Sequence, residues 1–267
     1  MSTHNSKKMM SIIKYKDKAC GLHCIKVNNL TVKFGTSTIL EDINIHIHCG
    51  KMTAVIGQNG AGKSTFVKAL TGEIPHEGTI EFKDKRTNST SKLSIGYVPQ
   101  FLNVEKNTPV SVYDLAAASI SSYPAFLPRK KALREEVKDM LSLFEATDLI
   151  DKPLCDLSGG ELQRVMLSLS VNPVPNLLLL DEPISGMDDN GTRLFYENIN
   201  YLKNHYDLAV ILVSHDLEYV AKYADSVILL NKNVLKAGTP KEVFESDEFK
   251  EVFGHISFGE VSDGSNI

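Results

Sequence analysis

The sequence lacks the features that mark membrane-spanning and nucleic-acid-binding proteins. No run of about 18 apolar residues occurs, so we expect no transmembrane helix. The formal net charge is -4, so no overall positive field attracts DNA or RNA. Residues 1–18 are polar and basic and contain no apolar core of a signal peptide. We therefore expect a protein that stays in the cytoplasm and does not bind nucleic acid.

Cysteine is also scarce, with four residues among 267. Such a number fits a reducing compartment and gives no disulfide framework. Hydrophobic residues make up 42% and charged residues 23%, which is typical of a globular protein. The length suits one large α/β domain or two small domains.

Apolar spacing divides the chain into three parts. Residues 1–21 show little periodicity and are predicted to be a flexible N-terminal arm. Residues 22–246 are predicted to form the main domain, and residues 247–267 a C-terminal tail. Within the domain, helices are expected over most of residues 101–171 and over 192–206. Strands are expected over residues 25–34, 38–48, 52–56, 79–83, 94–98, 176–181, 208–213, 227–230 and 234–236, the first two and the last two as hairpins.

The most informative stretch is residues 57–65, which lie between an apolar run and a helical pattern. A glycine loop in this strand–loop–helix context predicts a phosphate-binding P-loop. Glycines let successive backbone N–H groups face one anion, and the following helix adds its positive N-terminal end. Lys63 would reach the β- and γ-phosphates, and the Ser64 hydroxyl would ligate Mg²⁺. The alternative is a glycine-rich turn with no ligand.

A second apolar stretch, residues 177–181, ends in the acid Asp181, and a second acid, Glu182, follows it directly. A strand that places a carboxylate beside a P-loop is the Walker B arrangement, so Asp181 is expected to hold Mg²⁺. Glu182 would then lie beside the γ-phosphate and polarise the attacking water. The alternative is a buried strand that ends in a solvated acidic turn.

A second glycine motif opens the helix expected after residue 158. Ser158 and Glu161 have the spacing of a capping box, which alone indicates only a helix start. Gly159 and Gly160 are poor helix formers at this position. They are explained if their bare backbone N–H groups must face an anion.

These motifs, together with three others in a fixed order, resemble an ABC-type ATPase subunit over about residues 25–245. The other three are Gln100 after residues 97–99, residues 185–188 and residues 214–216. The resemblance implies an α/β P-loop NTPase fold, with a RecA-like core, an antiparallel β-subdomain and a helical signature subdomain inserted at about residues 102–155. It also implies hydrolysis of ATP to ADP and phosphate, coupled to transport.

The resemblance further implies a role for each matching position. Glu182 resembles the catalytic carboxylate, His215 the switch histidine and Gln100 the Q-loop residue; with Lys63 they are the expected catalytic residues. The expected Mg²⁺ ligands are Ser64, Gln100 and Asp181. The expected ATP-binding residues are Phe34, which would stack on adenine, then Gly57, Gln58, Asn59, Gly60, Ala61, Gly62, Lys63, Ser64 and Thr65, then Ser158, Gly159 and Gly160 from an opposite subunit, with Asp188 at the dimer junction. For Phe34 the alternative is a strand residue that faces a core.

Partners and substrate follow from the same resemblance. It implies a homodimer of ATPase subunits, transmembrane permease subunits, an extracytoplasmic metal-binding protein and a place on the cytoplasmic side of the membrane. Residues 109–114 and 253–259 are similar to the zinc/manganese importer branch. The alternatives are an ATPase for another substrate, such as an iron chelate, heme or an exported drug, and a non-transport ABC-type ATPase acting on ribosomes or DNA.

A cluster of cysteine and histidine near the N-terminus suggests an accessory Zn²⁺ site. If the first hairpin folds about Thr36, Cys24 lies opposite His48, and His46 shares their face. Cys20 and Cys49 could add ligands, because thiolate and imidazole suit Zn²⁺. The alternative is that these residues meet by chance at a hairpin end.

Two departures from the family pattern are visible. Residues 165–169 and 172–176 differ from the residues that many relatives carry there, and both could alter packing near a membrane partner. Gln58 stands in the P-loop where proline is frequent, and we expect this difference to be neutral.

Overall fold

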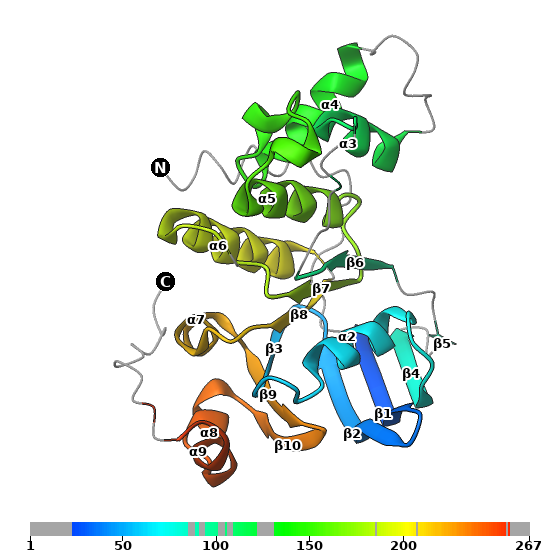
Figure 1. Ribbon diagram of the computed structural model, residues 1–267, viewed down its shortest axis with the longest axis vertical. Coiled ribbons are helices and arrows are strands. Elements are labelled where there is room, and N and C mark those ends of the chain that lie inside the picture. The colour runs from blue at the N-terminus through cyan, green and yellow to red at the C-terminus, as the bar shows by residue number, and fades with distance from the viewer. Residues whose placement is uncertain are drawn as a thin grey trace.

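The computed structural model describes residues 23–84, 89–90, 94–100, 105, 109–121, 131–184, 186–206, 208–254 and 256. These residues form two β-sheets and a helical lobe that extends along the long axis of the molecule (Figure 1). The predicted N-terminal arm, residues 1–21, lies outside the described residues. No helix in the described part of the chain is both long and apolar enough to cross a membrane.

The larger sheet has six strands and carries the centre of the molecule. Its order is β10 (Asn233–Gly238), β9 (Ser226–Asn231), β3 (Met52–Ile56), β8 (Ala209–Val213), β7 (Leu177–Asp181) and β6 (Ile95–Val98). All neighbours are parallel except β10, which forms the predicted hairpin with β9. Every residue of β3, β7 and β8 is buried, as their continuous apolar runs predict. The carboxyl ends of the parallel strands therefore share one edge.

The smaller sheet is antiparallel, in the order β2 (Ser37–His48), β1 (His23–Phe34), β4 (Glu77–Asp84) and β5 (Ser89–Thr90). The predicted first hairpin is confirmed, and its register places Cys24 opposite His48 as expected. One core cluster joins this sheet to α2 (Lys63–Thr71) and to one face of β7 and β8. The helix is therefore fixed against both sheets.

The helical lobe contains α3 (Val112–Ile120), α4 (Lys131–Ser142), two short 3-10 turns, η1 (Thr147–Leu149) and η2 (Leu154–Asp156), and α5 (Gly159–Ser170). On α4, Val137, Met140 and Leu141 are buried in the core of the lobe. Phe144 lies beyond the end of α4 and packs instead in the cluster beneath α6 (Asp189–His205). The boundaries of the inserted subdomain, 102–155, stay a prediction.

The C-terminal part of the described chain forms three helices, α7 (Leu217–Tyr223), α8 (Pro240–Phe244) and α9 (Asp247–Phe253). In the predicted C-terminal tail, residues 247–253 are helical, and Phe249 is buried in a cluster with β3, α7 and β9. The sequence did not predict that this helix packs on the domain, because the apolar spacing of residues 247–253 is weak. A single buried aromatic residue, Phe249, holds the helix in place. Residue 256 is described beyond it, whereas 255 and 257–267 lie outside the described residues.

Candidate active site

The candidate site lies at the shared carboxyl edge of β3, β7 and β8. β3 leads into residues 57–62 and then α2, β7 ends at Asp181, and β8 ends just before Ser214. Parallel strands deliver the residues that follow them to one place, which is where α/β sheets bind ligands. Three segments that are far apart in the sequence therefore meet here.

The glycine loop has the backbone that an anion-binding loop requires. Gly60 and Gly62 have φ angles of 84° and 100°, in the left-handed region that favours glycine. A Cβ on Gly62 would lie 2.6 Å from a methyl carbon of Leu40, so neither the angle nor the space admits a side chain. Gly62 is also the N-cap of α2, whose positive end faces the loop.

Lys63 is held inside this loop. Its Nζ donates to the carbonyl oxygens of Gly57 at 2.7 Å and Gln58 at 3.1 Å. Burial lowers the pKa of the Lys63 amine, whereas the charges of Glu182 and Asp181 act in the opposite direction. The residue is only 9% exposed, so most of the lysine is enclosed by its surroundings.

The two acids after β7 have different environments. Asp181 is 4% exposed, and burial together with the charge of Glu182 raises the pKa of its carboxyl, while a hydrogen bond to Ser64 and the charge of Lys63 lower it. Glu182 has a φ of 50°, which is unusual for a residue with a side chain. Its backbone N–H donates to Val213 O at 2.9 Å, which ties this strained residue to β8.

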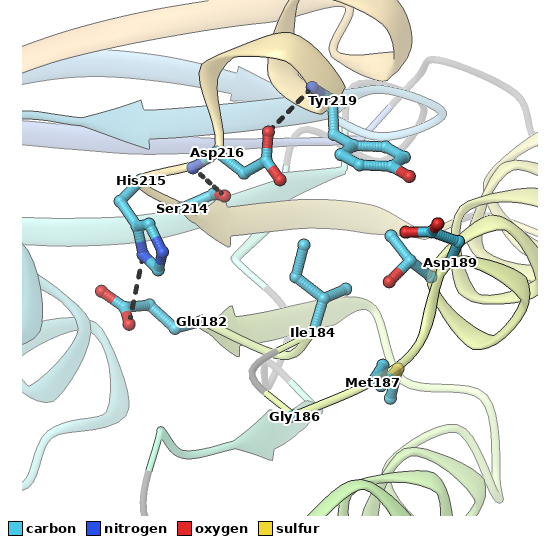
Figure 2. Close-up of a pocket in the computed structure, with 10 residues that line it drawn as sticks. Glu182, Ile184, Gly186, Met187, Asp189, Ser214, His215, Asp216 and Tyr219 are labelled. Carbon is cyan, nitrogen blue, oxygen red and sulfur yellow. Dashed lines mark hydrogen bonds and ion pairs between the residues drawn. The ribbon is translucent and has the colours of Figure 1, made fainter.

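The Glu182 carboxylate is contacted by two side chains from other elements. Gln100 Nε2 donates to Glu182 Oε2 at 2.6 Å, and His215 Nδ1 lies 3.4 Å from the same oxygen. Figure 2 shows His215 and Glu182 pointing toward one another in the lining of a pocket that Met187 and Tyr219 also line. The His215 side chain is 73% exposed, so it is free to contact a ligand above Glu182.

The glycine motif at residues 158–160 is on the helical lobe, at the start of α5. Ser158 and Glu161 form the predicted capping box, and Lys152 binds Glu161 at 2.8 Å. A Cβ on Gly159 would meet nothing within 4 Å, whereas one on Gly160 would lie 2.6 Å from the Gly186 carbonyl oxygen. Gly159 therefore has open space beside it. Figure 1 shows α5 in the upper part of the molecule and α2 in the lower part, on opposite sides of β6 and β7.

Two other predicted site residues occupy distinct places. Phe34, at the end of β1, is 53% exposed and does not face a core, which disfavours the alternative given above. Asp188 is the N-cap of α6 and accepts a hydrogen bond from Gly191 N at 2.8 Å. Ser185 lies outside the described residues.

The residues expected to hold Mg²⁺ fit that ion. The Ser64 hydroxyl and the Asp181 carboxylate are hard oxygen donors in contact with one another. Burial disfavours the ionised Asp181 carboxylate, and a bound divalent cation would compensate that charge. Gln100 contacts Glu182 through its amide nitrogen and lies beside the same acidic pair.

The accessory Zn²⁺ site receives no support. Among the described residues, no group of three or more His, Cys, Asp or Glu side chains is arranged to hold a metal ion. Cys24 and Cys49 are buried, and the rings of His46 and His48 lie with their centroids 4.1 Å apart and their planes tilted by 44°. Cys20 lies outside the described residues.

Sequence reasoning missed one contact of the loop. Gln58 Nε2 donates to the backbone carbonyl of Val252, which is 194 positions away. No spacing rule connects residues so distant, because their contact depends on how α9 packs on the sheet.

Comparisons with known proteins agree with this geometry. The model of the family described as ABC transporter matches residues 40–185. The zinc import ATP-binding protein ZnuC of Photorhabdus laumondii is 37% identical over 86% of this chain and 84% of its own length. ZnuC 2 of Aliivibrio fischeri is 38% identical over 86% of this chain and 88% of its own length. Among solved structures, a metal-chelate type ABC transporter in an inward-facing conformation has a TM-score of 0.71 and 27% identity, over 87% of this chain and 89% of that one.

Proposed function

This chain belongs to the ABC transporter family as an ATP-hydrolysing subunit, and from that premise we propose that it powers the import of zinc or manganese through a transmembrane permease. The relatives named for zinc import support the choice of a divalent metal ion. The arrangement of Glu182 between Gln100 and His215, beside the buried Lys63, carries the proposal for hydrolysis.

Glu182 is the proposed general base. Its carboxylate is oriented by the hydrogen bond from Gln100, so one oxygen is held while the other can face a water molecule. Accepting a proton from that water would activate it for attack on the γ-phosphorus. Residue His215 lies next to the same carboxylate and would contact the γ-phosphate.

Lys63 is proposed to neutralise the phosphate oxygens on which negative charge develops. Its present acceptors are two loop carbonyls, so moving to a phosphate exchanges neutral acceptors for charged ones. Bound Mg²⁺ would supply further charge neutralisation at the β- and γ-phosphates, held by Ser64 and Asp181. Phe34 would stack on the base, since its ring is exposed at a strand end.

A head-to-tail homodimer is the proposed working form. Ser158, Gly159 and Gly160 lie at an exposed N-terminus of α5, on the lobe that carries no P-loop. In a dimer each would reach the ATP held by the other copy, with Asp188 near the junction. Hydrolysis would then remove the γ-phosphate contacts and shift the population toward the open dimer.

The remaining partners belong to the transport cycle. ABC transporter subunits act with transmembrane permeases, and the helical lobe is the proposed docking element for that partner. An extracytoplasmic metal-binding protein would deliver the ion, and the chain would sit on the cytoplasmic side of the membrane.

The test of the catalytic proposal is Glu182→Gln. We expect ATP binding to remain, turnover to fall by at least 10²-fold because general-base catalysis contributes 10²–10⁴-fold, and a dimer to persist with ATP on size-exclusion chromatography. Lys63→Ala is the contrasting variant, which should lose ATP binding itself. Normal hydrolysis by Glu182→Gln would remove Glu182 from its role.

The test of the substrate uses the purified subunit reconstituted with its permease in vesicles. ATP hydrolysis should rise when zinc or manganese is supplied with the binding protein, and the Glu182→Gln complex should show no such rise. If an iron chelate stimulated ATP hydrolysis instead, or if neither zinc nor manganese did, the proposal of zinc or manganese import would be contradicted. ATP hydrolysis by the subunit would still stand.

A further inference from the structure

The side chain of Gln58 reaches from the phosphate loop to the last turn of α9. Its Nε2 donates to the Val252 carbonyl oxygen at 2.5 Å. The last four carbonyls of a helix have no partner within that helix and need one elsewhere. Gly254 N satisfies the Lys250 carbonyl, and Gln58 satisfies that of Val252. The loop therefore caps a helix that follows it by almost 200 positions.

α9 is anchored to the elements on either side of the candidate active site. Phe249 is 1% exposed and belongs to one apolar cluster with Ile56, the last residue of β3 before the loop. The same cluster includes Val220 of α7, the helix that follows His215. α8 and α9 lie beside β9 and β10 in Figure 1. A bond from Gln58 to α9 is thus a bond to a fixed support.

The backbone of Gln58 also organises the loop from within. Its carbonyl oxygen accepts from Ala61 N at 3.1 Å and from Lys63 Nζ at 3.1 Å. Fixing the side chain of Gln58 therefore limits the movement of its own backbone carbonyl. That carbonyl holds the turn of the loop through Ala61 and positions Lys63. A loop that is ordered before its ligand arrives loses less conformational entropy on binding.

We propose that Gln58 is a positioning residue for nucleotide binding, and that it acts through α9. The hydrogen bond to Val252 holds the phosphate loop in its binding shape and makes the C-terminal helix part of the support of the active site. A proline at this position would have no amide to donate, so Gln58 is not a neutral replacement in this chain. The inference rests on the nucleotide site proposed above.

Coupling of this kind is reciprocal. If the bond to α9 favours nucleotide binding, then bound nucleotide must stabilise the bond and the end of α9. Hydrogen exchange of the α9 amides, including Gly254 N, should slow when the loop is occupied. The α2 amides near Phe66 report occupancy itself, because they lie next to the phosphates.

The experiment uses the full chain with ADP and Mg²⁺, which avoids turnover. Gln58→Met keeps the length of the side chain and removes its donor. We expect a threefold to tenfold rise in the Kd for ADP, which corresponds to about one hydrogen bond. Exchange at α9 should lose its response to ADP, while exchange at α2 should still respond at saturating ADP. Lys250→Met is the matched control on α9, since it leaves the Val252 carbonyl untouched, and it should retain the affinity and both responses.

The outcomes separate this inference from the assigned site. An unchanged Kd in Gln58→Met, or an α9 that never responds to ADP in the unaltered chain, overturns the positioning role. A loss of affinity in Gln58→Met with the α9 response intact also overturns it, because the effect would not pass through this helix. Absence of ADP binding to the unaltered chain would overturn both the nucleotide site and the inference.

Discussion

Lys203 and Asp225 form an ion pair whose two members should contribute unequally to stability. The Lys203 side chain is 6% exposed and its Nζ bonds to Asp225 Oδ2, whereas the Asp225 side chain is 34% exposed. The same Asp225 oxygen accepts from Met52 N at 2.7 Å, at the start of the strand that leads to the phosphate loop. The pair thus connects α6 to β3 through the residue that precedes β9.

Asp225→Asn would leave a buried ammonium without its counter-charge. Breaking a buried pair costs about 3–5 kcal/mol, and the partial exposure of Asp225 reduces our expectation to about 2–4 kcal/mol. Lys203→Met removes the positive charge, and the methionine fills the volume of the lysine side chain. Asp225 keeps its hydrogen bond from Met52 N and stays partly exposed to solvent. We expect that change to cost less than about 1 kcal/mol.

Urea unfolding of the two single variants and the double variant, followed by circular dichroism, measures these differences. The double variant Lys203→Met with Asp225→Asn should be more stable than Asp225→Asn alone, because no buried charge is left unpaired. Equal losses for the two single variants would refute this reasoning, as would a double variant that loses the sum of both.

Three further predictions concern the active site. Phe34→Ala should weaken ATP binding about tenfold by loss of base stacking, with little change in urea midpoint because the ring is exposed; unchanged affinity in a fluorescence titration would count against stacking. Gly160→Ala should lower the urea midpoint because its Cβ meets Gly186 O at 2.6 Å, whereas Gly159→Ala has open space and should not; equal midpoints would contradict the close contact. The pKa of Asp181 is raised in the folded protein above its ordinary value of 3.8. At pH values above that ordinary pKa, ionisation of Asp181 therefore lowers the stability of the fold. Asp181→Asn should therefore abolish hydrolysis yet raise the urea midpoint at pH 7, and the gain should vanish below about pH 4; a gain that persists at low pH would exclude ionisation as its cause.

Residues with a local signal were predictable from the sequence. The phosphate loop, the acids after β7 and the capping box at Ser158 each depend on neighbours within a few positions. Parallel topology then brings the ends of β3, β7 and β8 to one edge, where the structure places His215 Nδ1 3.4 Å from Glu182 Oε2.

Residues whose contacts depend on tertiary packing were not predictable. The partner of Gln58 is set by the docking of α9, and α9 itself was assigned to a tail because one buried residue, Phe249, anchors it. The hairpin register of Cys24 and His48 was correct, yet it did not produce a metal site among the described residues, since strand pairing alone does not direct three ligands at one point.

The backbone of Glu182 has a consequence for attempts to make this protein more robust. Its φ of 50° costs a residue with a side chain about 1 kcal/mol that glycine would not lose. A random library selected only for heat resistance should therefore enrich glycine or asparagine at position 182. We expect the selected variants to be more stable to heat but unable to hydrolyse ATP, so any such selection must be paired with a screen for activity.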